Sequence, residues 1–319
     1  MNAAPAVARA AAFVAAFVLA AALLAACGGN AGDKAGMISV VTSLPVFADM
    51  VEQVGGDRVE VSSLFPAGAD PHTFEPGPAS VRRIVEADIV IVNGLDLEPG
   101  AVKVIEPNLA SNTPLVKMAE VAANEGRIEL RKFGEEGHIA GEPGEEGTDP
   151  HAWLSVPNAR EYARVIHDAL VQVDAKGAAT YDSHYDAYLA SLDDLDSYVK
   201  ETVSAVPQGQ GKIVSTHDAF GYIAEYLGFQ VVAVVAVSPG QEPSASDIAN
   251  LQNAVDDAGV RAVFQEPQLG AETDVLRGLA SDLGIRVCTL YSDSLDKRVT
   301  TYIELIRFNA DEIARCLAE

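Results

Sequence analysis

The sequence predicts an α/β protein of two lobes joined by one long helix, and three observations lead to this fold class. Short β-branched runs alternate with segments of helical periodicity, which is typical of parallel α/β sheets. The alternation breaks once, between about residues 157 and 206, where two helical patterns follow each other without a strand. Removing the first 26 of the 319 residues as an export signal leaves 293, which is more than one typical domain.

Seven runs are expected to form strands, because each is short and rich in β-branched residues. They are residues 38–42, 59–64, 89–92, 212–216, 231–235, 260–265 and 285–290. The break in the alternation separates the first three runs from the last four. We therefore expect an N-terminal α/β lobe over residues 37–173 and a C-terminal α/β lobe over residues 207–319.

The second helical pattern predicts the connection between the lobes, over residues 174–206. Its apolar side chains recur at alternating spacings of four and three, which is the stripe of an amphipathic helix packed on a core. They are Tyr181, Tyr185, Tyr188, Leu192, Leu195 and Val199. A helix of about 28 residues is roughly 40 Å long at 1.5 Å per residue, which is long enough to span two lobes.

The N-terminus is built for export. Arg9 is the only charged residue among the first 26, and residues 11–26 are an unbroken apolar stretch. A membrane-spanning helix needs about 20 such residues with flanking charges, so a signal peptide over residues 1–26 is the better interpretation. The segment Leu24-Ala25-Ala26-Cys27 resembles the lipobox of bacterial lipoproteins. This resemblance implies that Cys27 is lipidated and becomes the first mature residue, with residues 27–36 as a flexible tether.

The charge of the chain restricts its partners. The formal net charge is −24, and it becomes −25 once Arg9 is removed with the signal. Such a balance argues against nucleic acid and anionic lipid surfaces as partners and favours cationic ligands. Acidity alone is more often a solubility device, so it does not define a site.

Two cysteines, Cys288 and Cys316, remain in the mature chain. An oxidising compartment outside the cytoplasm would join any pair within reach, and we expect a disulfide. The alternative is that both are small buried hydrophobic residues, because Cys288 lies in an apolar run and Cys316 near the end of a helical pattern.

Four side chains among the predicted loops carry metal-binding chemistry. His72 and His151 each follow an Asp-Pro pair, His217 follows the run 212–216, and Asp293 follows the last run. Three of the four lie at the carboxyl ends of strands, where open α/β sheets place their ligands. A lone histidine there is more often a capping residue. The repeated Asp-Pro-His favours ligation, because proline stiffens the backbone before the ligand.

Three imidazoles and one carboxylate form a donor set that suits Zn²⁺. Mn²⁺ or Fe²⁺ would fit as well with a further oxygen. The ligands lie 79, 66 and 76 residues apart, far more widely than in a zinc finger, whose ligands cluster to organise a small local fold. We therefore predict a site between two lobes, with His72 and His151 from the first and His217 and Asp293 from the second.

Six ordered segments carry a resemblance to a known family: DPHTFEP, DPHAWLSVPNAR, STHDAFGYIAEYLG, QEPSASDIANL, VRAVFQEP and YSDSL. They resemble the zinc- and manganese-binding lipoproteins of ABC-type importers over nearly all of the mature chain. The resemblance implies two α/β lobes on one rigid helix, with metal ligands at His72, His151, His217 and Asp293. His217 matches the zinc-type members, whereas manganese-type members usually carry glutamate there. Ser155 departs from the family, in which aspartate is common.

The zinc-type members often have a histidine-rich loop between their first two ligands. Residues 125–148 of this chain are instead rich in glutamate and glycine, with His138 as the one histidine. This composition predicts a mobile loop. His138, Glu135 and Glu136 either form a weak accessory collector of cations or belong to a solvated acidic loop without a role.

Three functions are consistent with the sequence. The first is the zinc-binding subunit of an ABC-type importer: an extracytoplasmic monomer, lipid-anchored to the membrane through Cys27, that delivers the ion to a permease. The second is the same protein tuned to manganese or iron. The third is a secreted zinc hydrolase with Glu75 or Glu266 as base. It is the weakest, because no His-Glu-x-x-His motif is present and a fourth protein ligand closes the site. We therefore expect no catalytic residue.

Overall fold

The computed structural model describes residues 36–133, 147–236, 240 and 244–318. From Ile38 onward the chain forms one compact unit. Several predicted features lie outside the described residues: the signal peptide, Cys27 with most of its tether, and the loop residues Glu135, Glu136 and His138. None of the helices that are described is long and apolar enough to cross a membrane.

The first lobe contains a four-stranded parallel sheet with the strand order β2-β1-β3-β4. Its strands are β1 (Ile38–Thr42), β2 (Val59–Ser63), β3 (Ile89–Val92) and β4 (Leu115–Lys117), and its helices are α2 (Pro45–Gly55), α3 (Pro78–Val85), α4 (Pro99–Ile105) and α5 (Met118–Asn124). Three of these helices begin at proline, whose fixed φ suits the first helical position. The first three strands confirm the sequence prediction, whereas β4 was not predicted.

The second lobe repeats this topology with the strand order β6-β5-β7-β8, again parallel. Its strands are β5 (Lys212–His217), β6 (Gln230–Ala236), β7 (Ala262–Gln265) and β8 (Arg286–Thr289), and its helices are α8 (Gly221–Leu227), α9 (Ala245–Ala258) and α10 (Ala271–Leu283). A capping box between Ser244 and Asp247 begins α9. All four strands predicted for this lobe are present.

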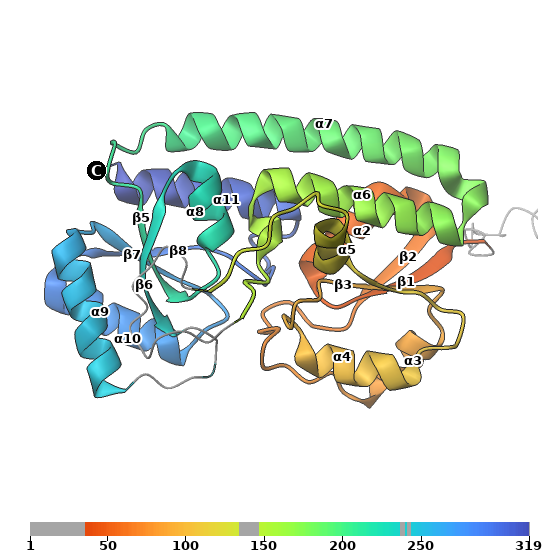
Figure 1. Ribbon diagram of the computed structural model, residues 1–319, viewed down its shortest axis with the longest axis horizontal. Coiled ribbons are helices and arrows are strands. Elements are labelled where there is room, and N and C mark those ends of the chain that lie inside the picture. The colour runs from red at the N-terminus through yellow and green to blue at the C-terminus, as the bar shows by residue number, and fades with distance from the viewer. Residues whose placement is uncertain (1–35, 134–146, 237–239, 241–243, 319) are drawn as a thin grey trace, which may run out of the picture. The chain divides into compact units, whose positions relative to one another are not determined.

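Two consecutive helices, α6 (Val156–Val173) and α7 (Ala178–Val203), replace the missing strand, as predicted. Helix α7 has 26 residues and is therefore about 39 Å long. It runs over both sheets in Figure 1 and packs against α2, α6 and the C-terminal helix α11 (Tyr302–Leu317). The predicted stripe is buried, except that Tyr185 is half-buried. The long linking helix of the predicted fold class is thus confirmed.

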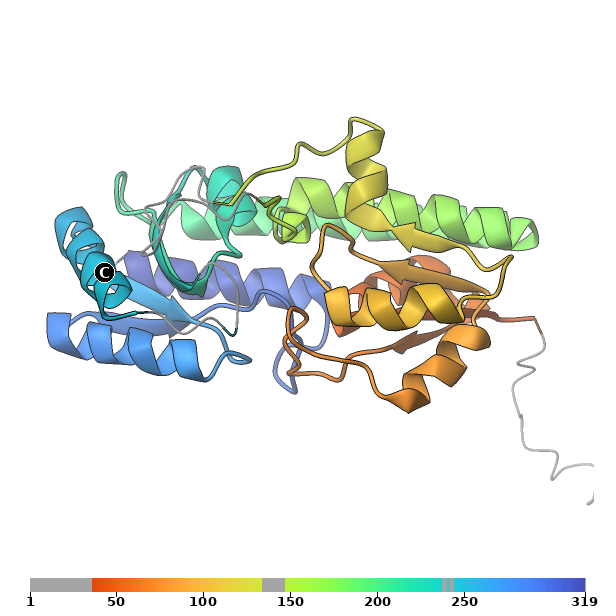
Figure 2. The ribbon, with the colours of Figure 1, turned by 60° about the horizontal axis from the view of Figure 1, so that its bottom comes forward.

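Helix α11 forms a second connection between the lobes. It lies beside α7 in both views of the ribbon (Figures 1 and 2) and also packs against α2 of the first lobe. The backbone N–H of Tyr302 donates to Asp49 Oδ2 of α2 at 2.8 Å. A single cluster of buried apolar side chains extends from the first sheet through α7 into α11. The two lobes therefore share one apolar core along these two helices.

A disulfide joins Cys288 of β8 to Cys316 of α11, with 6.7 Å between their Cα atoms. It holds the edge strand of the second sheet to the helix that reaches the first lobe. Asp293 lies a few residues after β8, so this disulfide also restrains the segment that carries a predicted ligand.

We expect the paired substitution Cys288→Ala and Cys316→Ala to lower the free energy of unfolding. The disulfide closes a loop over a separation of 28 residues, and constraining a loop of that length in the unfolded chain is worth about 3–4 kcal/mol. Thermal and urea unfolding would measure the loss. Reducing agent should destabilise the unsubstituted protein by a similar amount and leave the variant unchanged. Equal effects of reductant on both proteins would contradict the disulfide.

Candidate metal centre

The four predicted ligands converge at one point. One ligand atom from each of His72, His151, His217 and Asp293 lies within 4.8 Å of all the others. The His151 Nε2 atom is 3.3 Å from His72 Nε2 and 3.4 Å from His217 Nε2. The Asp293 oxygens lie 3.5 Å from His151 Nε2 and 3.6 Å from His217 Nε2. His151, His217 and Asp293 are buried, and His72 is partly exposed.

The sheet topology explains this convergence. In each sheet the strand order reverses direction between two central strands, β1 and β3 or β5 and β7, and ligands bind at such switch points. His217 ends β5, and Glu266 directly follows β7. In the first sheet, Asn93 follows β3, and its amide donates to the backbone oxygen of Pro150 at 3.0 Å. The switch points of both sheets therefore border the same site.

Both Asp-Pro-His segments form the same local turn. The backbone N–H of His72 donates to Asp70 Oδ1 at 3.0 Å, and that of His151 donates to Asp149 Oδ1 at 2.9 Å. Aspartate commonly accepts such a bond from the residue two positions later, and the intervening proline fixes φ. The motif therefore orients each histidine backbone before the fold brings the two side chains together.

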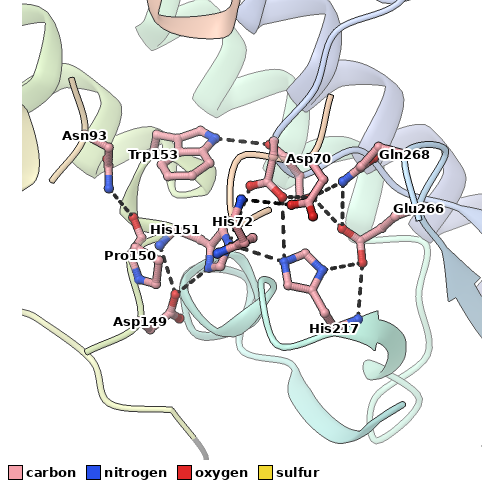
Figure 3. Close-up of polar contacts among 12 residues, drawn as sticks. Asp70, His72, Asn93, Asp149, Pro150, His151, Trp153, His217, Glu266 and Gln268 are labelled. Atoms are coloured by element: carbon pink, nitrogen blue, oxygen red, sulfur yellow. Dashed lines mark hydrogen bonds and ion pairs between the residues drawn. The ribbon is translucent and has the colours of Figure 1, made fainter. Parts of the chain in front are cut away.

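Two carboxylates orient the buried imidazoles (Figure 3). The Nδ1–H of His151 donates to Asp149 Oδ1, and the Nδ1–H of His217 donates to Glu266 Oε1, both at 2.8 Å. A proton held at Nδ1 leaves Nε2 as the atom that binds a metal. The two Nε2 atoms face each other across the centre. This arrangement of carboxylate, histidine and metal position is the usual outer support of a metal site.

The distances between the nitrogens fit a four-coordinate ion. A tetrahedral edge is about 1.63 times the bond length, so zinc–nitrogen bonds of about 2.0–2.1 Å give edges of about 3.3–3.4 Å. The two Nε2···Nε2 distances are 3.3 and 3.4 Å. The longer edges to the Asp293 oxygens also suit a slightly larger ion.

The pKa values of the clustered residues show how burial and neighbouring charges act on the site. Burial lowers the pKa of His72 and of His151 well below the usual value. Burial also acts to lower the pKa of His217, but the charge and hydrogen bond of Glu266, together with Asp293, outweigh it and raise the pKa to about 9. Burial raises the pKa of Asp293 to about 7. The carboxylates of Glu266 and Asp293 therefore favour a positive charge at the position of His217.

The sequence did not predict that Asp149 and Glu266 would hold the imidazoles in place. Asp149 was noted only as part of its motif, and Glu266 was considered as the base of a hydrolase. Glu266 is buried and accepts hydrogen bonds from His217, Thr216 and Ser292. Its position directly after β7, at a switch point, is the signal that could have identified it. Glu75, the other candidate base, is exposed.

Trp153 packs against the cluster from the first lobe. It is buried with its ring centroid 5.4 Å from that of His151, and its Nε1–H donates to the backbone oxygen of Ser292 at 3.2 Å. That bond links the first lobe to the segment that carries Asp293. His167 lies outside the cluster and contacts Asp168 and Asp182.

A cavity of about 390 Å³ borders the cluster at His72, the one ligand that is not fully buried. Asp96 and Glu120 contribute carboxylates to its wall. Phe133 and Gly147, which flank the undescribed part of the acidic loop, also line it and are joined by a backbone hydrogen bond of 3.1 Å. The base of the acidic loop therefore lies next to the predicted site.

Comparison with known proteins places this geometry in a family. The family described as zinc-uptake complex component A, periplasmic, matches residues 40–316, which include all four clustered side chains. The chain belongs to this family. A solved structure with the same fold is the periplasmic zinc-binding protein TroA from Treponema pallidum, with 26% identity, a TM-score of 0.77, and coverage of 89% of this chain and 100% of that one.

Named relatives of this family member bind different metals. The chain is 29% identical to the manganese-binding lipoprotein MntA of Halalkalibacterium halodurans, over 91% of this chain and 92% of that protein. It is 27% identical to the iron ABC transporter substrate-binding lipoprotein MtsA of Streptococcus pyogenes, over 90% and 91%. These names include manganese and iron beside the zinc of TroA, so similarity alone does not select the ion.

We expect Asp149→Asn to weaken Zn²⁺ binding about tenfold, the lower end of the effect of removing an outer support from a histidine ligand. The substitution keeps the shape of the side chain but removes the charge that holds the Nδ1–H of His151. Competition with a chromogenic chelator would measure the dissociation constant. Asp186→Asn, which removes the same charge from the exposed face of α7, is the matched control. Equal affinities of the two variants would show that Asp149 does not support the site.

Proposed function

We propose that this chain is the extracytoplasmic subunit of an ABC-type importer that captures Zn²⁺ and delivers it to a membrane permease. The observation that carries the proposal is the cluster itself, in which three imidazole nitrogens and a carboxylate converge at 3.3–3.6 Å within a buried site. Ligands from both lobes enclose the ion, which suits capture and delivery. Membership of the family and its named relatives support the same function.

The choice of zinc over manganese or iron rests on the donor atoms. Imidazole nitrogen suits zinc, whereas manganese prefers harder oxygen ligands and a higher coordination number. His217 supplies a third nitrogen, and Glu266 fixes the orientation of its ring. A manganese or iron cargo is the alternative, and the longer edges to Asp293 are the observation that favours it.

A hydrolase is less well supported. Catalytic zinc sites keep one position open for water, whereas here Asp293 would be the fourth protein ligand. Glu266 accepts the Nδ1–H of His217 and is therefore engaged in holding a ligand. We infer that the site binds and releases its ion without catalysing a reaction.

The proposal extends to the whole chain, including the parts outside the described residues. Residues 1–26 would direct export, Cys27 would carry the lipid that anchors the protein to the membrane, and residues 27–36 would tether it as a monomer. The first lobe would comprise residues 37–173, the linking helix residues 174–206 and the second lobe residues 207–319. His138, Glu135 and Glu136 would collect cations weakly beside the cavity at His72, since that cavity lies at the base of their loop.

We expect the protein purified without added metal to contain zinc, and saturating zinc to raise the melting temperature of the metal-free form. An ion that binds only the folded state adds about 4 kcal/mol at a thousandfold excess over the dissociation constant. His72→Ala should remove most of this gain. His167→Ala, which deletes an imidazole outside the cluster, should keep it. Metal analysis and calorimetry supply the measurements, and a full zinc response in His72→Ala would exclude His72 as a ligand.

We expect His217→Glu to change the relative affinity for zinc and manganese. The substitution replaces a nitrogen with a carboxylate that can offer two oxygens to an ion of higher coordination number. The variant should bind zinc less tightly, and its affinity for manganese should rise relative to its affinity for zinc. Zinc should still be the more tightly bound ion, because manganese stands at the weak end of the divalent affinity series. Competition titrations of both proteins would give the ratio of dissociation constants. An unmoved ratio would remove the main support for zinc selectivity through His217.

A further inference from the structure

His72 lies in a loop that has little support from its own lobe. This loop, residues 64–77, connects β2 to α3 and forms neither helix nor strand, and we call it the ligand loop. Its residues 66–68 are exposed. Apart from the contact between the rings of His72 and His151, residues 66–73 make one hydrogen bond to a described residue outside the loop. In that bond the backbone N–H of Gly68 donates to Ser294 Oγ of the second lobe at 2.6 Å.

Both partners of this bond are oriented for it. The backbone N–H of Ala69 donates to the oxygen of Pro66 at 3.2 Å and closes a turn, in which Gly68 has a φ of 85°. Glycine adopts this left-handed conformation without steric cost. The hydroxyl of Ser294 donates its proton to the backbone oxygen of Leu295 at 3.2 Å, so its lone pairs are left to accept from Gly68.

The chain between Gly68 and His72 is constrained, so the position of one affects the other. The backbone N–H of His72 donates to Asp70 Oδ1, and that of Phe74 donates to the backbone oxygen of Asp70, both at 3.0 Å. Pro71 fixes φ between them. A displacement of the Gly68 turn would therefore also displace His72.

The segment that carries Ser294 is fixed on both sides. Trp153 Nε1–H of the first lobe donates to the backbone oxygen of Ser292 at 3.2 Å. The side chain of Ser292 contacts Glu266 and the amide nitrogen of Gln268 in the second lobe. Ser294 is itself buried. It is therefore a fixed point against which the ligand loop rests.

We propose that Ser294 is a positioning residue that holds His72 in the metal site from the opposite lobe. The bond from Gly68 docks the ligand loop on the segment that carries Asp293, next to the three buried ligands. His72 is the ligand that is not fully buried, so packing restrains it least. Without the bond, the ligand loop would have to be ordered each time an ion binds, and that ordering costs affinity. This inference rests on the proposed function of the site as a binder of divalent metal.

We expect Ser294→Ala to raise the dissociation constant for Zn²⁺ about threefold, because a hydrogen bond between neutral groups contributes modestly. Ser294→Thr keeps the hydroxyl and should retain the affinity. Ser80→Ala is the matched control. It removes a buried hydroxyl of α3 that accepts from Arg83 of the same helix at 3.2 Å, and it should leave the constant unchanged. Competition with a chromogenic chelator measures each constant.

The same substitution in a chain without His72 separates positioning from a general structural role. Ser294→Ala should have no further effect on the zinc affinity of His72→Ala, because the ligand on which it acts is gone. Independent substitutions would instead add. Calorimetric titration reaches the weak affinities of these variants.

Gly68→Ala tests the bond from its other partner. A Cβ at Gly68 meets no atom within 4 Å, so the substitution adds the strain of a positive φ to the turn without a clash. It should weaken zinc binding when His72 is present and have no effect in His72→Ala. It also serves as the test if Ser294→Ala does not fold.

The outcomes distinguish this inference from the proposed function beneath it. If the unsubstituted protein does not bind zinc, both are overturned. If it binds zinc but Ser294→Ala and Gly68→Ala leave the dissociation constant unchanged, the positioning role of Ser294 is overturned and the proposed function stands. An equal loss of affinity with and without His72 would show that Ser294 acts through Asp293 or the fold, which also overturns the inference.

Discussion

The convergence of three imidazoles and a carboxylate in a buried space is the constraint on which the rest of the structure depends. Such groups lose their hydration and gain little from one another until a cation enters. Holding them within 4.8 Å therefore requires a scaffold that does not relax. The continuous apolar cluster along α7 and α11 supplies this rigidity, and Trp153 ties the first lobe to the backbone of Ser292 beside Asp293.

The repeated sheet topology explains how two small parallel sheets produce such a site. Each sheet has one switch point, and a residue at each switch point supports an imidazole. In the first lobe, Asn93 donates to the backbone oxygen of Pro150, which precedes His151. In the second lobe, Glu266 accepts from the ring of His217. One sheet alone offers only half of the donor set. Two sheets with their carboxyl ends at a common boundary complete it, which explains why the ligands are so widely spaced in the sequence.

Local patterns predicted most of the fold, because strand periodicity and the stripe on α7 are encoded within a few turns of chain. Strand β4 was not predicted because its three half-buried residues are too few to show a period. The four clustered residues were found because they follow strands or an Asp-Pro pair. The contacts among Ser292, Gln268 and Glu266 could not be found in this way. They join different loops of the second lobe, and only tertiary packing places one hydroxyl between two carboxylates.

The scaffold also determines how binding relates to folding. In a zinc finger the metal creates the fold, because the polypeptide has little core without it. Here two apolar clusters and a disulfide form a core that does not involve the site, so the lobes are specified before any ion arrives. A bound cation would lower the free-energy cost of burying these polar groups together, because the carboxylates of Glu266 and Asp293 favour positive charge beside them. An ion that binds the folded state then adds stability to a fold already formed.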